Sequence, residues 1–165
     1  MIIIKTSQGD ISVKLYPEKT PETVANFLEY VREGFYNNTI FHRVIADFMI
    51  QCGGYDPELN TKETRKPIQN EAKNGLSNLR GTVAMARRPD AHSATSQFFI
   101  NVVDNTYLDY KAPIDECYGY CAFGEVVEGM DVVDKISKVK TGTYQLFRDM
   151  PVEKVTISEI IEVED

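Results

Sequence analysis

Residues 41–51 read Phe41-His42-Arg43-Val44-Ile45-Ala46-Asp47-Phe48-Met49-Ile50-Gln51, and they place a cation and an amide inside a mostly apolar run. Two strand-like runs joined by a short turn predict a β-hairpin. Burying an arginine is costly unless it has partners. Arg43 therefore needs a nearby carboxylate, a lining rich in carbonyl oxygens, or a ligand.

The register of this hairpin has two possible forms. A two-residue turn at Ala46-Asp47 places Arg43 opposite Ile50. A three-residue loop, 46–48, instead places Arg43 opposite Gln51, with Met49 on the same face and Phe48 projecting from the loop. We favour the second register because it lets the Gln51 amide orient the guanidinium. The alternative interpretation of the segment is an exposed barrel face that happens to carry an arginine and a glutamine.

The rest of the chain predicts many strands and few helices. One helix begins with Thr20 as N-cap and Pro21 in its first turn, and it ends at Gly34. A second, shorter helix fits 129–138. This pattern favours a closed or nearly closed β-barrel whose ends are covered by helices. Strands are expected at 2–5, 11–15, 40–45, 48–51, 81–86, 97–103, 121–127 and 154–163, and the long irregular stretches 53–80 and 104–120 are expected to line a site or to be mobile.

Length and composition limit the possible functions. A chain of 165 residues predicts a single domain, 1–165. The net charge of −7 argues against nucleic acid as a partner, since phosphate binding depends on clustered Lys and Arg. The chain shows neither a signal peptide nor a membrane-spanning run, so no membrane is expected as a partner. Three cysteines without disulfide-scaffold spacing favour a reducing, cytoplasmic location, and nothing in the sequence demands more than a monomer.

A second informative run is Thr95-Ser96-Gln97-Phe98-Phe99-Ile100-Asn101. Its alternation puts Gln97, Phe99 and Asn101 on one face and Phe98 and Ile100 on the other. Because both faces are partly apolar, one face is expected to meet the core and the other a pocket. The alternative is a simple buried aromatic strand.

The sequence also contains the residue types of two other kinds of site. A hydrolytic triad could be drawn from Asp90, His92, Ser93 and Ser96, but these residues are crowded into seven positions without a nucleophile elbow or an oxyanion motif. A metal site needs several His, Cys or carboxylate ligands, and the chain has only two histidines. We therefore expect no hydrolase, no metal and no cofactor.

Five ordered motifs resemble those of the cyclophilins, the peptidyl-prolyl cis-trans isomerases. The motifs are Phe41 to Ile45, Phe48 to Gln51, Gly81 to Ala86, Ser96 to Ile100 and Phe123 to Met130, and the helix at Pro21 to Phe27 also fits. The resemblance runs nearly end to end and is strongest to bacterial cytoplasmic members. It implies a closed eight-stranded antiparallel β-barrel capped by two α-helices, with the active groove on the outside of the barrel.

The resemblance also implies roles for individual residues. Arg43 and Gln51 are expected to be catalytic, with His42 beside the arginine shaping the site. The pocket for the proline ring is expected from Phe48, Met49, Phe99 and Leu108, and the peptide is expected to be held by Gln51, by the Ala86-Arg87 backbone and by Gln97. Tyr107 stands at the position that holds tryptophan in many eukaryotic relatives, and Tyr120 at that of a histidine.

The chemistry of the reaction agrees with these residues. Rotation about an X-Pro bond removes amide resonance, and the prolyl nitrogen regains a lone pair in the twisted transition state. A donor aimed at that nitrogen, which Arg43 can be, stabilises the transition state and not the planar ground state. The expected partners are proline-containing peptides and unfolded or nascent chains, and binding of the cyclic peptide ciclosporin is expected to be weak. A different class of function, a proline-peptide binding module or chaperone, stays open.

Overall fold

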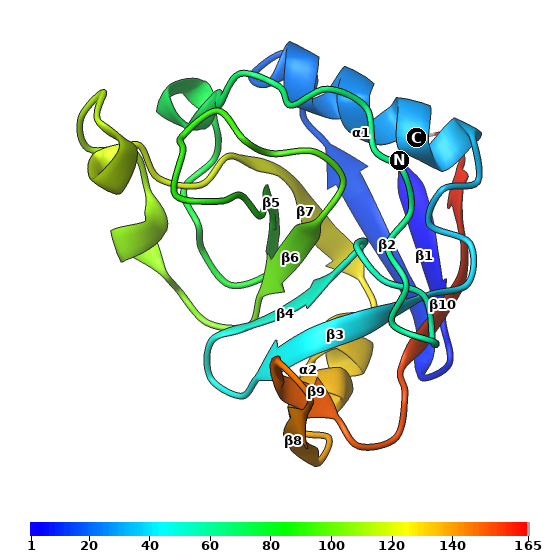
Figure 1. Cartoon of the computed structure of the whole chain (residues 1–165). Coiled ribbons are helices and arrows are strands. Elements are labelled where there is room, and N and C mark those ends of the chain that lie inside the picture. The colour runs from blue at the N-terminus through cyan, green and yellow to red at the C-terminus, as the bar shows by residue number, and fades with distance from the viewer. Residues whose placement is uncertain (165) are drawn as a thin grey trace.

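The computed structural model describes residues 1–164, in which eight strands close into one antiparallel barrel (Figure 1). Helix α1 (Pro21–Arg32) covers one end of the barrel and α2 (Met130–Ser137) the other. The predicted fold class is confirmed, and only Asp165 of the predicted domain lies outside the described residues. Around the barrel the strands follow in the order β1 (Ile2–Thr6), β10 (Thr156–Glu162), β3 (Thr39–Ile45), β4 (Met49–Cys52), β6 (Phe98–Asn101), β5 (Thr82–Met85), β7 (Ala122–Glu128) and β2 (Gly9–Leu15).

The β3–β4 hairpin has the three-residue loop. Arg43 pairs with Gln51, and Ile45 pairs with Met49, so the two-residue turn is wrong. Asp47 adopts the left-handed conformation in the loop, with φ of 61°, a region that aspartate tolerates better than most residues. The register therefore puts the arginine and the glutamine side by side on the outside of the barrel.

A bulge at His42 shifts the alternation of β3. The register slips between Phe41 and Arg43, so that Phe41 and Val44 both reach the inner core while Arg43 faces outward. One unpaired residue re-aims the side chains that follow it, as bulges next to sites commonly do. Arg43 is exposed rather than buried, and its charge keeps contact with water.

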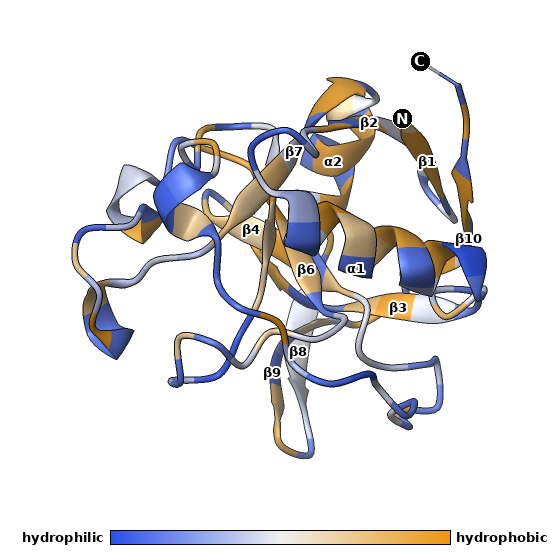
Figure 2. Cartoon of the chain, turned by 90° about the horizontal axis from the view of Figure 1, so that it is seen from above, coloured by the Kyte–Doolittle hydropathy of each residue, from blue (hydrophilic) through white to orange (hydrophobic). Residues whose placement is uncertain are grey.

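The inside of the barrel is filled by one hydrophobic cluster that includes side chains from α1. Phe27 packs edge-on against Phe98 at 5.3 Å and also contacts Phe123 and Tyr36. In Figure 2 the hydrophobic colouring gathers on the strands and helices, whereas the surrounding loops are largely hydrophilic. Among residues 1–164, no helix combines the length and the apolar composition needed to cross a bilayer.

Helix α1 begins and ends close to the predicted positions. Thr20 is the N-cap, but its hydroxyl donates to Tyr16 O and not to the helix. The Glu71 carboxylate accepts instead from the Thr23 N–H at 2.7 Å, which supplies the negative charge that a helix N-terminus favours. Gly34 follows the helix with φ of +72°, the left-handed conformation that commonly ends helices.

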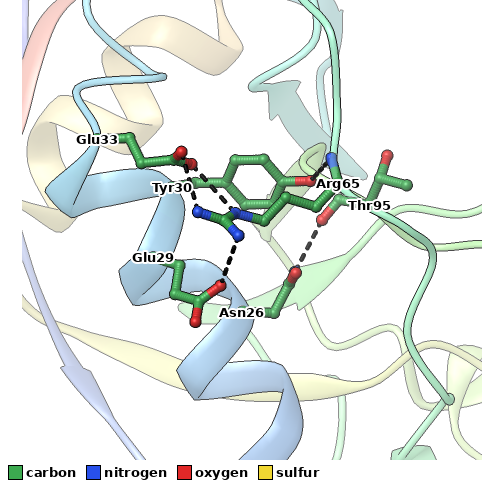
Figure 3. Close-up of polar contacts among 6 residues, drawn as sticks. All are labelled: Asn26, Glu29, Tyr30, Glu33, Arg65 and Thr95. Carbon is green, nitrogen blue, oxygen red and sulfur yellow. Dashed lines mark hydrogen bonds and ion pairs between the residues drawn. The ribbon is translucent and has the colours of Figure 1, made fainter.

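Polar contacts hold the long loop 53–80 and the segment before β6 against α1 (Figure 3). The Arg65 guanidinium forms ion pairs with Glu29 at 3.2 Å and with Glu33 at 2.9 Å, while its backbone N–H donates to the Tyr30 hydroxyl. On the same helix, Asn26 donates to the Thr95 carbonyl at 2.9 Å. These contacts fix the approach of the chain to β6, which carries part of the site.

One hairpin was missed by the sequence prediction. It consists of β8 (Thr141–Tyr144) and β9 (Phe147–Pro151), and it lies beside β3 (Figure 1). Its strands are short and mostly exposed, so they show no apolar alternation that could announce them. The predicted helix 129–138 is confirmed as α2, with Gly129 as its N-cap.

Candidate functional site

A row of outward-facing residues crosses four neighbouring strands and forms the floor of a groove. Arg43 of β3 pairs with Gln51 of β4, Gln51 pairs with Phe99 of β6, and Phe99 pairs with Ala84 of β5. Directly opposed residues lie on the same face of a sheet. The predicted faces of the run 95–101 are confirmed, because Phe98 and Ile100 enter the inner core while Phe99 lies outside it.

The groove contains a cavity of about 240 Å³ on the outside of the barrel. Its apolar wall belongs to a second hydrophobic cluster, separate from the barrel core. The cavity is lined by Arg43, Phe48, Met49, Gln51, Ala86, Arg87, Phe99, Leu108 and Tyr120. The structure thus brings together nine of the twelve residues expected from the sequence.

The other three expected residues lie around this cavity and not in it. Gln97 lines a neighbouring cavity of about 210 Å³ that shares Gln51, Ala86 and Arg87 with the first. Tyr107 is 60% exposed and stacks on Phe48 at 6.4 Å, outside the lining. His42 lines a third cavity, which shares Arg43 with the first.

A chain of side-chain hydrogen bonds orders the polar edge of the groove. Gln51 Nε2 donates to Gln97 Oε1 at 2.9 Å, which fixes the Gln51 amide so that its oxygen points toward Arg43. Arg43 Nη1 then donates to Gln51 Oε1 at 3.4 Å, a long contact. Arg43 has no carboxylate within ion-pair distance in the part of the chain that the structure describes. Its remaining N–H groups are therefore available to a ligand.

The backbone at 86–87, which lines the cavity, has one N–H group without an acceptor in the described chain. The Ala86 N–H is already engaged, since it donates to Gln97 O at 3.0 Å. The Arg87 N–H has no acceptor among residues 1–164. The Ala86-Arg87 backbone was expected from the sequence to hold a peptide. Its free donor in the structure is the Arg87 N–H.

The Arg87 side chain joins Tyr120 to the loops at 88–89 and 115–119. Its guanidinium lies 4.7 Å from the centre of the Tyr120 ring. It also donates to the carbonyl oxygens of Gly119, Asp115, Arg88 and Pro89. Tyr120 in turn packs edge-on against Phe99 at 5.9 Å. The loop 104–120, which lacks regular strands, is thereby held in place against the groove.

A buried network of three asparagines, which was not predicted from the sequence, supports the pocket. Asn101 Nδ2 donates to Asn78 Oδ1 at 3.1 Å, and Asn105 Nδ2 donates to Asn101 Oδ1 at 2.9 Å and to Phe48 O at 3.0 Å. Asn78 also donates to Tyr120 O at 3.1 Å. The only signal in the sequence was Asn101, a polar residue at the end of an apolar strand. Buried polar networks of this kind fix the position of the segments that they join.

Replacing Asn105 with alanine is expected to lower the free energy of unfolding by about 1–3 kcal/mol, because Asn101 Oδ1 loses its buried donor and Phe48 O keeps only the Val102 N–H. The wall made by Phe48 should also loosen, which raises KM for peptide. Urea unfolding and steady-state kinetics measure the two effects. The exposed Asn60→Ala is the matched control and should change stability by less than about 0.5 kcal/mol. Equal stability of the two variants would contradict the supporting role of Asn105.

His42 is buried and uncharged at neutral pH. Burial, together with the neighbouring Arg43 charge, lowers the pKa of its imidazole from 6.5 to about 4. Its Nδ1 has no hydrogen-bond partner within residues 1–164. The ring packs edge-on against Tyr55 at 4.8 Å. His42 thus forms an uncharged wall beside Arg43.

The hydrolytic triad is not assembled. His92 Nδ1 accepts from the Asn70 backbone N–H at 3.0 Å, while Ser93 Oγ donates to the carbonyl of Asp90 at 2.7 Å. Ser96 is buried and donates to Gly53 O. No serine hydroxyl is therefore activated by the histidine. Within the described residues, no group of three or more His, Cys, Asp or Glu side chains is arranged to hold a metal ion.

The resemblance to the cyclophilins that the sequence indicated is tested by comparison with known proteins. The family model of the cyclophilin type peptidyl-prolyl cis-trans isomerases matches residues 1–162. The chain is 57% identical over 164 residues to peptidyl-prolyl cis-trans isomerase B of Escherichia coli, covering 96% of this chain and 100% of that protein. It is 54% identical to the isomerase cyp18 of Streptomyces antibioticus, covering 93% of each chain.

The fold is also similar to that of a solved cyclophilin structure. A cyclophilin type isomerase of Cryptosporidium parvum, crystallised in the presence of the dipeptide Ala-Pro, superposes with a TM-score of 0.84 at 25% identity, covering 99% of both chains. The chain belongs to the cyclophilin family and is a peptidyl-prolyl cis-trans isomerase.

Proposed function

We propose that the enzyme accelerates rotation about X-Pro bonds in unfolded and refolding chains, with Arg43 donating to the prolyl nitrogen in the twisted transition state. The observation that carries this proposal is the placement of Arg43. Arg43 stands at the edge of an apolar cavity and lacks a carboxylate partner in the described chain. The hydrogen-bonded pair Gln51–Gln97 orders the surroundings of the Arg43 guanidinium. The proline ring is assigned to that cavity, between Phe99, Met49 and Leu108.

The height of the barrier decides how much Arg43 can contribute. The uncatalysed rotation has a barrier of about 18–20 kcal/mol and takes tens of seconds or longer. One charge-assisted hydrogen bond contributes about 1.5–3 kcal/mol, whereas a millionfold acceleration needs about 8 kcal/mol. Arg43 therefore supplies a minor part of the stabilisation.

The remainder is assigned to positioning. The ring is held by the apolar wall, and the carbonyl that precedes the proline accepts from the free Arg87 N–H. Gln51 sits between the two, with its amide fixed by Gln97. Holding both sides of the rotating bond favours the twisted geometry over the many others available in water. No proton is transferred in this scheme, so the neutral His42 takes no chemical part.

Tyr107 and Tyr120 affect the expected binding of the cyclic peptide ciclosporin. Tyr120 lines the cavity and is held from behind by Arg87. Tyr107 lies at the rim, where its ring stacks on Phe48 and remains largely exposed. A tyrosine offers a smaller contact area than tryptophan at such a rim. We propose that ciclosporin binds weakly for this reason.

The proposal is tested by two-dimensional NMR exchange on a short Ala-Pro peptide with catalytic amounts of enzyme. We expect exchange between the cis and trans forms to become faster, and the prolyl-limited refolding phase of a model substrate protein to shorten. An Ala-Ala peptide provides the control for binding that does not depend on proline. Peptide binding without faster exchange would refute isomerisation in favour of a binding module. Faster exchange of the peptide with unchanged refolding would refute the folding role alone.

A further inference from the structure

Arg43 lines, in addition to the proposed proline pocket, the third cavity described above. This cavity has a volume of about 430 Å³ and lies where the tip of the β8–β9 hairpin meets β3 (Figure 1). None of the twelve residues expected at the site belongs to the hairpin. The cavity is lined by His42, Arg43, Tyr55, Leu146, Phe147 and Arg148.

The apolar part of this cavity consists of three rings in successive edge-on contact. Phe147 packs edge-on against Tyr55 at 4.9 Å, and Tyr55 packs edge-on against His42 at 4.8 Å. Leu146 stands at the hairpin tip with 97% of its surface exposed. These ring contacts hold the hairpin against the strand that bears Arg43, and Arg43 lines both this cavity and the groove.

The charged part of the cavity consists of two guanidinium groups. Neither Arg43 nor Arg148 has a carboxylate within ion-pair distance among residues 1–164. Arg32, Arg65 and Arg80, in contrast, all form such pairs. In a chain with a net charge of −7, two unpaired arginines over one cavity attract an acidic group.

The direction of a bound peptide follows from the proposed function. If the carbonyl before the proline accepts from the Arg87 N–H, the preceding residues lie toward the cavity shared by Arg87, Arg88 and Gln97. The residues after the proline then pass Arg43. An extended chain advances about 3.3 Å per residue, and Arg43 lines both cavities, so we place the second or third residue after the proline at the cavity between Arg43 and Arg148.

We propose that this cavity is a specificity site for an aspartate or glutamate two or three residues after the proline. The carboxylate contacts Arg148 and the outer face of the Arg43 guanidinium, while its methylene groups lie on Phe147 and Leu146. This inference rests on the proposed function and names its preferred substrates, which are X-Pro segments followed by an acidic residue.

The test compares two pairs of peptides by titration calorimetry and NMR exchange. The first pair carries Glu or Gln at both the second and the third position after an Ala-Pro unit, and the second pair carries them at the second and third positions before it. We expect the wild type to bind the first Glu peptide about 3- to 10-fold more tightly than its Gln counterpart at low salt. Arg148→Gln should reduce that ratio by about twofold or more and leave the ratio for the second pair unchanged. Lys138→Gln, which removes an exposed cation from the end of α2, is the matched control and should alter neither ratio.

The outcomes separate this inference from the proposed function. If the wild type accelerates exchange of no peptide, the proposed function itself fails. Acceleration with equal affinity for the first Glu and Gln peptides overturns the specificity site alone. The same holds if Arg148→Gln keeps the wild-type ratio, or if Lys138→Gln lowers it equally, because the effect then comes from the overall charge.

Discussion

Replacing Arg43 with alanine is expected to lower kcat/KM for a short Ala-Pro peptide by about 10- to 150-fold. The range corresponds to the loss of one charge-assisted hydrogen bond to the prolyl nitrogen, about 1.5–3 kcal/mol. Arg43 is exposed and lacks a carboxylate partner in the described chain, so its removal leaves no buried charge behind. The fold should be unaffected, and unfolding in urea should give the same midpoint as the wild type.

The loss is expected in kcat more than in KM, since the donor acts only when the prolyl nitrogen has regained its lone pair. Arg43→Lys should restore part of the rate at most, because a lysine keeps the charge but not the planar fork of donors. Arg32→Ala, which removes an exposed arginine from α1, is the control and should keep full activity. Equal exchange rates for wild type and Arg43→Ala would remove the arginine from the mechanism.

The second large effect concerns the stability of the enzyme in acid. The pKa of His42 falls from 6.5 to about 4 on folding, so above pH 6.5 the imidazole is neutral in both the folded and the unfolded state. As the pH falls from 6.5 toward 4, the unfolded chain takes up a proton that the folded chain refuses. The free energy of unfolding then drops by about 1.4 kcal/mol per pH unit, or about 3 kcal/mol in all.

Urea unfolding of wild type and His42→Gln between pH 7.5 and pH 4 measures this loss. We expect the difference in unfolding free energy between the two proteins to shift by about 3 kcal/mol in favour of the variant as the pH falls. Other acid-titrating groups are common to both proteins and cancel in the difference. A difference that stays constant with pH would show that the folded protein accepts the proton on His42. Activity should not follow this titration, because the proposed mechanism gives the imidazole no part in the reaction.

Much of the fold was accessible from the sequence because its signals are local. The polar pair Arg43 and Gln51 selected the register of β3 and β4, and Pro21 and Gly34 marked the ends of α1. Phe99 and its alternating neighbours revealed a strand covered on both faces. The hairpin β8–β9 could not be predicted, because its exposed strands carry no apolar pattern.

The site was less predictable where it depends on the path of loops. The bulge at His42 turns that residue away from the groove, and simple alternation gives no sign of it. The loop 104–120 has no period, so the position of Tyr107 outside the lining could not be foreseen. The asparagines of the supporting network are far apart in sequence, and only the folded chain brings Asn78, Asn101 and Asn105 together.

The row that runs from Arg43 through Gln51 and Phe99 to Ala84 links activity to correct pairing of the barrel. If β4 slipped by one residue, Gln51 would turn into the core and Ile50 would turn into the groove. Such a misfolded barrel would contain every residue of the candidate site, and we expect it to be inactive. Recovery of isomerase activity during refolding therefore reports native strand register, whereas helix content measured by circular dichroism can return before it.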